Sequence, residues 1–233
     1  MFHGIIIAMD GILIVNKPQG MTSHDVVDVV RRLYGTRKVG HAGTLDPMAT
    51  GVLVVLIGRA TKLSDGLTAC EKEYDATLTL GARSSTADAW GKMEAASGPI
   101  DFTDDEIRSA FGRFIGEIEQ TPPAYSAKKI NGEKMYNLAR RGQDIDVKPQ
   151  KVFIKDIAVS MIKLPDVSFR MTCSKGTYVR QVCADIGDVL NCGGYLSRLD
   201  RTRSGAFTLK QASLLDELKT MSIEQLSERL LPI

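Results

Sequence analysis

The residues from Gly40 to Leu53 read GHAGTLDPMATGVL and combine three glycines with one carboxylate, Asp46. Glycine permits a positive φ or the close approach of another backbone. Pro47 biases Asp46 toward extended dihedrals, so we expect the carboxylate on a fixed turn before a buried strand at Val52–Ile57. A fixed polar loop on a rigid strand often carries a catalytic group. On spacing alone, an aspartate that caps a turn is the commoner interpretation.

Two phosphate-binding motifs can be excluded for this glycine-rich loop. A Walker A loop needs a lysine directly after its last glycine, and none follows Gly51. A dinucleotide fingerprint opens a helix, whereas Val52–Ile57 has the composition of a strand. The closely spaced ligand pairs of a structural zinc site are also missing. We therefore expect no cofactor and no metal, and reduced, mostly buried cysteines at Cys70, Cys173, Cys183 and Cys192.

The composition is that of a soluble globular protein. The 233 residues are 43% hydrophobic and 25% charged, enough for one large domain or two small ones. The apolar run from Ile5 to Ala8 is interrupted by Asp10 and is too short for a secretory signal or a membrane span of about 20 residues. The sequence thus predicts a cytoplasmic protein. No low-complexity linker divides it, so we expect one main domain.

The net charge of +2 does not decide for or against nucleic acid, but the charges are segregated. Residues 88–119 hold eight acidic and three basic side chains. Residues 128–156 hold eight basic and four acidic side chains. Residues 198–210 hold four basic side chains and one acidic side chain. Positive segments of this kind suit a phosphate backbone. Solvated loops explain the same pattern equally well.

Capping signals and hydrophobic periodicity predict the elements that position the loop. Capping boxes at Thr22 and Thr103 predict the starts of two helices, and Gly35 ends the first. Strands and helices follow one another without a regular βαβ repeat, which favours an α+β fold with a mixed or antiparallel sheet. The other expected elements are a helix through Phe114, a turn at Asn131-Gly132, helices at Glu133–Arg141 and Val179–Leu190, two short C-terminal helices, and strands at Gly11–Val15, Glu71–Leu80, Val167–Cys173 and Tyr195–Arg203.

The Gly40–Leu53 loop resembles the catalytic motif of the bacterial tRNA pseudouridine-55 synthase family, the TruB type. The resemblance covers roughly residues 10–213. It implies the pseudouridine synthase fold, with a central sheet, flanking helices and a catalytic cleft. It also implies an isomerase that cleaves the N-glycosidic bond of a T-loop uridine, position 55 of tRNA, and rejoins the base through C5 without a cofactor. Further segments match in the same order: NKPQGMTSHDVV, GRATKLSD, EKEYDATLTLGARSSTADAWG, CSKGTYVRQVCADIG and GGYLSRLDRTRSGAF.

The resemblance assigns chemical roles to three residues. Asp46 aligns with the invariant catalytic aspartate, which either attacks the sugar covalently or deprotonates it. Arg180, in GTYVR, aligns with an arginine that pairs with this aspartate and would hold it ionised. Tyr74 aligns with a tyrosine that stacks on the target base and could take the C5 proton. Without the resemblance, a surface arginine and a packing tyrosine would be the commoner interpretations.

Further residues are implied to bind the RNA, whose target base must be flipped out of the T-loop at a cost of a few kcal/mol. The ordinary explanations for such residues are core packing for the apolar and aromatic ones and solvated surface for the lysines. The implied set consists of Tyr178 and Leu199 lining the uracil pocket, His41 in the space that the base vacates, Lys62 in the cleft, and Lys17 of the first motif.

The resemblance also implies a domain organisation. The catalytic domain would span residues 1–213, with a basic insertion at 120–150 that closes over the RNA, and a short helical tail would follow at 214–233. Full-length members usually continue into an RNA-binding domain of the PUA type. This chain stops at Ile233, about where that domain would begin. We expect the PUA domain to be absent, either in a naturally short member or in a truncated chain.

The expected partner is tRNA, bound through its T-arm stem-loop by a monomer that needs no protein partner and no membrane. A non-catalytic RNA-binding or tRNA-folding protein on the same fold is one alternative. It would not require Asp46, Tyr74 and Arg180 together. A synthase of the guide-RNA-dependent branch is another, and it would be expected to carry the missing domain and partner proteins. Activity on bare tRNA separates this branch from the tRNA enzyme.

Overall fold

The structure is a computed structural model that describes residues 9–96, 98–123, 129–130, 133–135, 141 and 147–233. The chain divides into two compact units, the first formed by the residues up to Lys72 with Asp200–Ile233 and the second by Glu73–Leu199. No composition shift or linker in the sequence marks this division. Its boundary at residue 213 stays a prediction, and its RNA-clasping insertion at residues 120–150 lies largely outside the described residues.

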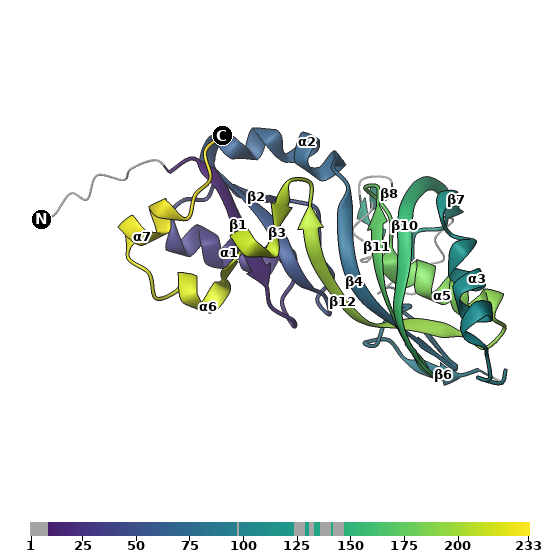
Figure 1. Cartoon of the computed structure of the whole chain (residues 1–233). Coiled ribbons are helices and arrows are strands. Elements are labelled where there is room, and N and C mark those ends of the chain that lie inside the picture. The colour runs from purple at the N-terminus through teal and green to yellow at the C-terminus, as the bar shows by residue number, and fades with distance from the viewer. Residues whose placement is uncertain (1–8, 97, 124–128, 131–132, 136–140, 142–146) are drawn as a thin grey trace, which may run out of the picture. The chain divides into compact units, whose positions relative to one another are not determined.

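The first unit is built on a mixed sheet. Its elements are β1 (Gly11–Lys17), α1 (Ser23–Leu33), β2 (Val39–Ala42), β3 (Thr50–Ile57), the 3-10 helix η1 (Gly58–Leu63), α2 (Ser64–Ala69), residues 200–204 of β12 (Gly194–Ser204), β13 (Phe207–Thr208), the 3-10 helix η2 (Leu209–Gln211), β14 (Ser213–Leu214), α6 (Leu215–Leu218) and α7 (Ile223–Glu228). Strand β3 pairs antiparallel with β1 and β2 and parallel with β12, while β14 is parallel to β1. Helices α1 and α2 contact β2, and α6 contacts β1 and β14 (Figure 1).

The strand predicted at Val52–Ile57 is confirmed as the centre of this unit. Every one of its six side chains is at most 1% exposed. Removing this apolar surface from water stabilises the unit by roughly 25 cal/mol per Å². Because β3 lies between β1 and β2, the loop before it starts from a rigid base.

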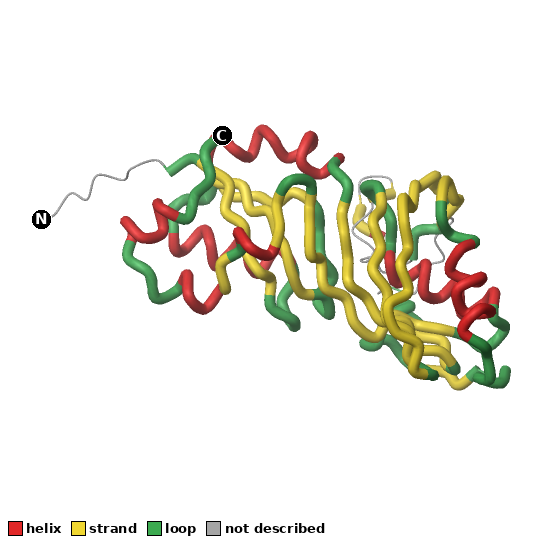
Figure 2. The backbone as a smooth tube through the Cα atoms, in the orientation of Figure 1, coloured by secondary structure: helices red, strands yellow, loops and turns green. Residues whose placement is uncertain are grey.

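The second unit places strands beside helices, as the colours of Figure 2 show. Its elements are β4 (Lys72–Leu80), β5 (Ala82–Ser84), β6 (Met93–Ala95), α3 (Asp104–Gly112), β7 (Gly116–Gln120), β8 (Lys129–Ile130), β9 (Glu133–Lys134), β10 (Gln150–Lys163), β11 (Asp166–Cys173), α5 (Val179–Val189) and residues 194–199 of β12. The main strands follow the order β12-β4-β11-β10-β7. Helix α3 contacts both β10 and α5, and the rings of Phe111 and Phe169 meet edge to face at 5.0 Å.

The locally encoded predictions are confirmed. Thr22 and Thr103 each form a complete capping box, at the starts of α1 and α3. Side chains of β4 and β11 alternate between buried and more exposed positions, as the period of two predicts. All four cysteines are free, and Cys173, Cys183 and Cys192 are buried. The α+β class with a mixed sheet is also confirmed.

Two predictions need correction. The glycine-rich loop is shorter than predicted, because residues 39–42 form β2 and residues 50–51 belong to β3, which leaves 43–49 as the loop. The helix predicted at Glu133–Arg141 is wrong at its start, since Glu133 pairs with Ile130 in an antiparallel ladder. Strand pairing there overrides the helical propensity of the sequence. The turn predicted at Asn131-Gly132 lies outside the described residues.

Candidate active site

Asp46 lies half-buried in the loop of residues 43–49, which joins β2 to β3. Gly43 opens this loop with a φ of +93°, a conformation that favours glycine. The Ala49 N–H donates to the Asp46 carbonyl at 3.0 Å and closes a turn around the candidate residue. Asp46 is therefore presented by a short turn between two paired strands.

The main chain before Asp46 is clamped to the start of α1. The Leu45 N–H donates to Ser23 Oγ at 2.8 Å, and Ser23 Oγ donates to the Leu45 carbonyl at 3.1 Å. Both residues are buried. The Thr22 capping box fixes the first turn of α1, so the clamp itself is rigid.

The main chain after Asp46 is held by the turn that follows β1. The Gly20 N–H donates to the Pro47 carbonyl at 2.9 Å. Lys17 Nζ donates to the carbonyls of Pro18 and Met21 at 2.8 and 2.7 Å and lies 3.5 Å from that of Pro47. The Lys17 side chain is fully buried, so desolvation lowers its pKa to about 8, against an opposing attraction to Asp46. In this position Lys17 links the turn after β1 to the Pro47 carbonyl of the loop.

The other two candidates of the first unit lie on neighbouring elements. His41 is on β2, where it pairs with Val55 of β3 and is partly exposed. Lys62 is exposed on the 3-10 helix η1. Their predicted roles in filling the vacated base position and in contacting RNA stay predictions.

In the second unit, Tyr74 and Leu199 lie on strands β4 and β12 and are 8% and 7% exposed. Because successive side chains of a strand point to opposite faces, Asp75 faces away from Tyr74. Asp75 accepts two hydrogen bonds from Arg170, at 2.8 and 3.0 Å, on that opposite face. One face of this sheet thus carries the buried Tyr74, and the opposite face carries the ion pair of Asp75 with Arg170.

Tyr178 and Arg180 lie together at the start of α5. Gln120 fixes Tyr178 through both main-chain groups: its Nε2 donates to the Tyr178 carbonyl at 3.1 Å and its Oε1 accepts from the Tyr178 N–H at 2.8 Å. Arg180 is 3% exposed, and its Nη1 donates to the Thr86 carbonyl at 2.9 Å. Its guanidinium also lies 5.8 Å from the centre of the Tyr178 ring, within cation–π range.

Asp88 is a residue that the sequence analysis missed. Its buried carboxylate accepts hydrogen bonds from Thr86 Oγ1 at 2.6 Å and from the Trp90 N–H at 3.0 Å. It thereby fixes the turn whose Thr86 carbonyl receives Arg180. The signal was present, because the segment SSTADAWG is rich in the Ser, Thr and Asp residues that bond their own backbone.

The candidates fall into two groups. Lys17, His41, Asp46 and Lys62 belong to the first unit, and Tyr74, Tyr178, Arg180 and Leu199 belong to the second. The pairing of Arg180 with Asp46 stays a prediction from the sequence. Among the described residues, no group of three His, Cys, Asp or Glu side chains is placed to share a metal ion. In the same part of the chain, each helix is too short or too polar to cross a membrane.

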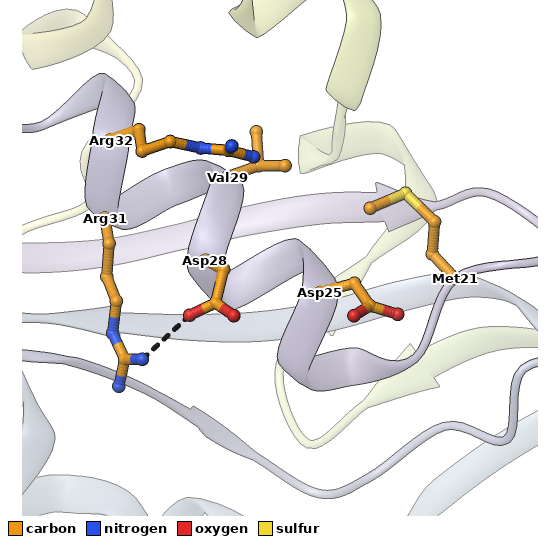
Figure 3. A pocket seen from close by; sticks show the side chains of 6 residues that line it. All are labelled: Met21, Asp25, Asp28, Val29, Arg31 and Arg32. Atoms are coloured by element: carbon orange, nitrogen blue, oxygen red, sulfur yellow. Dashed lines mark hydrogen bonds and ion pairs between the residues drawn. The ribbon is translucent and has the colours of Figure 1, made fainter.

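A separate hollow of about 490 Å³ lies along α1 and contains none of the candidates. Its polar lining is partly self-paired, because Arg31 Nη1 bonds Asp28 Oδ1 at 2.8 Å, as Figure 3 shows. Arg31 also donates through Nη2 to the Val39 carbonyl at 3.1 Å. The hollow therefore gives no further candidate for the chemistry.

Known proteins match this chain along its length. Residues 31–179 match the family described as TruB family pseudouridylate synthase (N terminal domain), and residues 180–233 match the tRNA pseudouridylate synthase B C-terminal domain. A tRNA pseudouridine synthase B from Syntrophotalea carbinolica is 46% identical over 97% of this chain and 74% of its own length. One from Opitutus terrae is 41% identical over 97% and 93%.

Solved structures are similar as well. A Cbf5-Nop10-Gar1 complex contains a chain that is 30% identical, with a TM-score of 0.73 over 95% of this chain and 60% of that one. An H/ACA ribonucleoprotein bound to a substrate RNA containing 2'-deoxyuridine gives 29% identity and a TM-score of 0.68, over 93% and 54%. With a matching domain model over most of the sequence and relatives above 40% identity, the chain belongs to the TruB family of pseudouridylate synthases and is an isomerase that converts uridine to pseudouridine in tRNA.

Proposed function

We propose that the chain isomerises uridine 55 in the T-loop of tRNA and that Asp46 is its catalytic carboxylate. The observation that carries the proposal is the anchoring of the loop on both sides of this residue. Leu45 is bonded to Ser23 before it, and the Pro47 carbonyl is bonded by the Gly20 N–H after it. Catalytic groups need such support, because a site displaced by about 1 Å loses most of its rate.

The reaction breaks the bond between N1 and C1′ and forms a bond between C5 and C1′, after which the C5 proton leaves. A carboxylate near C1′ serves this chemistry by attack on the sugar or by removal of a sugar proton, and both roles need the ionised form. Tyr74 would stack on the uracil and Tyr178 and Leu199 would line its pocket. The burial of Tyr74 and Leu199 and the fixed main chain of Tyr178 support these assignments.

The enzyme would recognise the T-arm stem-loop with the target base flipped out, as a cytoplasmic monomer without a protein partner. His41 would occupy the space left by the base, and Lys62 would contact the RNA backbone. The exposure of Lys62 and the partial exposure of His41 support contact with RNA. Arg180 would pair with the Asp46 carboxylate, as the family motif implies, and its donors are already partly satisfied by the Thr86 carbonyl.

The first test is release of tritium from C5-labelled uridine in unmodified tRNA transcripts. The wild-type chain should release about one equivalent per tRNA, and Asp46→Asn should slow release by at least about a thousandfold while tRNA binding persists. Asp65→Asn is a matched control, because Asp65 is an exposed carboxylate of α2 in the same unit. A transcript with cytidine at position 55 should release nothing.

Two outcomes would contradict the proposal. Normal turnover by Asp46→Asn would remove the residue from the chemistry. Release from the transcript without uridine 55 would show a different target. The similarity to H/ACA proteins raises a guide-directed alternative, but the higher identity to tRNA enzymes favours bare tRNA as the substrate. Turnover only after addition of a guide RNA would establish that alternative.

A further inference from the structure

Arg201 is a buried cation in the first unit, only 1% exposed. Its guanidinium donates to three main-chain carbonyls. Nε bonds Val52 at 2.7 Å, Nη2 bonds Gly43 at 3.0 Å and Nη1 bonds Thr44 at 3.3 Å. Gly43 and Thr44 begin the loop that carries Asp46, and Val52 lies just beyond its end. One side chain therefore ties the start of this loop to strand β3, which follows the loop.

An arginine suits this position for geometric reasons. Its five N–H donors are spread over a rigid planar fork and can bond carbonyls that lie too far apart to share the single ammonium of a lysine. Burying a charge is costly unless its donors are satisfied, and here three of them bond carbonyl groups. The arrangement is therefore specific to a guanidinium.

The backbone around Arg201 is held equally closely. Strand β12 pairs Asp200 with Thr50 and Arg201 with Gly51, and Thr50 Oγ1 donates to Asp200 Oδ1 at 2.9 Å. Gly51 has a φ of +103°, and a Cβ there would lie 2.6 Å from Asp200 Oδ1 and 2.7 Å from Arg201 N. The start of β3 thus packs against β12 without room for a side chain at Gly51. This close packing fixes the main chain of Arg201, from which the guanidinium extends.

Arg201 also belongs to the local charge environment of the loop. Asp46 raises the pKa of Lys17 and Arg201 lowers it, so each of these two charges acts on the Lys17 ammonium. Lys17 bonds carbonyls of the turn after β1, while Arg201 bonds the first two residues of the loop. The two buried cations therefore bond different main-chain segments around the loop.

We propose that Arg201 is a positioning residue, whose guanidinium fixes the start of the 43–49 loop to strand β3 and thereby holds the Asp46 carboxylate at the reacting sugar. This inference rests on the proposed catalytic role of Asp46. It goes beyond that role, because Arg201 itself acts only through the main chain of the loop.

The test compares Arg201→Gln and Arg201→Lys in the tritium-release assay at saturating tRNA, with tRNA affinity measured by filter binding. Loss of the fork should lower kcat about a hundredfold in Arg201→Gln, while KM and tRNA affinity change less than about threefold. Arg201→Lys should recover about a tenth of the wild-type kcat, because one ammonium can bond only some of the three carbonyls.

Tyr34→Phe is the matched control for stability. Tyr34 is buried in the same unit, and its hydroxyl donates to the Leu226 carbonyl at 2.8 Å, away from the loop. This variant should lose thermal stability but keep the wild-type kcat. Wild-type kcat in Arg201→Gln, or kcat losses that merely follow the stability losses of all three variants, would overturn the inference. If Arg201→Gln does not fold, the kcat of Arg201→Lys decides alone. An active Asp46→Asn would instead refute the proposed function.

Discussion

The ammonium group of Lys17 is an unusual charge for a protein interior. It donates to main-chain carbonyls on the two sides of a turn and has no exposed surface. Sequence reasoning placed Lys17 among the RNA-binding candidates because it lies in a family motif. Its burial instead favours a role in supporting the Asp46 loop. A motif identifies which residue matters, whereas the role depends on where the fold places its charged end.

The burial of Lys17 should be visible in the pH dependence of stability. The pKa is about 8 in the folded state and 10.5 in the reference state. Between these values the unfolded chain holds a proton that the folded chain lacks, so this residue makes the free energy of unfolding rise with pH. The total rise is about 3 kcal/mol. Urea unfolding of wild type and Lys17→Met from pH 7.5 to 10.5 measures it, since other titrations cancel in the difference. A pH-independent difference would contradict the prediction.

At the scale of elements, helix α5 approaches β12 closely enough for backbone contact. A Cβ on Gly187 would overlap the main chain of Gly193 and Gly194, with the Gly194 Cα 2.6 Å away. The N–H groups of Cys192 and Gly193 also donate to the Gly187 carbonyl, at 3.1 and 3.0 Å. This contact fixes α5, which carries Tyr178 and Arg180 at its other end.

Gly187→Ala should therefore destabilise the fold by about 3 kcal/mol, because neither backbone can yield as a flexible side chain would. Gly66→Ala is the control. Gly66 lies in helix α2 with no atom within 4 Å of an added Cβ, so alanine there should stabilise by about 0.5–1 kcal/mol. Chemical denaturation of both variants gives the comparison. Equal effects of the two substitutions would show that helix propensity, not close packing, governs Gly187.

Elements governed by local chemistry were predictable from the sequence, and those interrupted by irregularities were not. Both capping boxes sit where T-x-x-D and T-x-x-E occur, because their hydrogen bonds join residues three apart. Strand β10 was missed although it has 14 residues. Register shifts between Ile154 and Asp156 and between Val159 and Met161 break its alternation, so no period of two is visible along it.

At the scale of the whole molecule, counting charges along the chain does not show which charges reach the surface. Residues 198–210 are basic in sequence, but Arg201 is buried and bonded to the loop. Arg198 lines a hollow of about 510 Å³ together with Asp75 and Arg170, on the sheet face opposite Tyr74. The motifs supplied the identity of the candidate residues. They could not show on which face each side chain lies, because that depends on the pairing of strands that are distant in the sequence.

This arrangement predicts which cations of the second unit contact tRNA. Lys175 is exposed on the loop before α5, three residues from Tyr178, and Gln150 fixes that loop by donating to the Gly176 carbonyl at 2.9 Å. Lys175→Ala should weaken tRNA binding severalfold and reduce the slope of log Kd against log salt by about 1, because one phosphate contact is lost. Arg198→Ala removes a charge that is also exposed, on the sheet face that carries Asp75, and should change neither quantity. Filter binding between 50 and 200 mM KCl makes the comparison. A weaker salt dependence in Arg198→Ala than in Lys175→Ala would place the RNA on the Asp75 face. The proposed role of Tyr74 would then be wrong, because Tyr74 points to the other face.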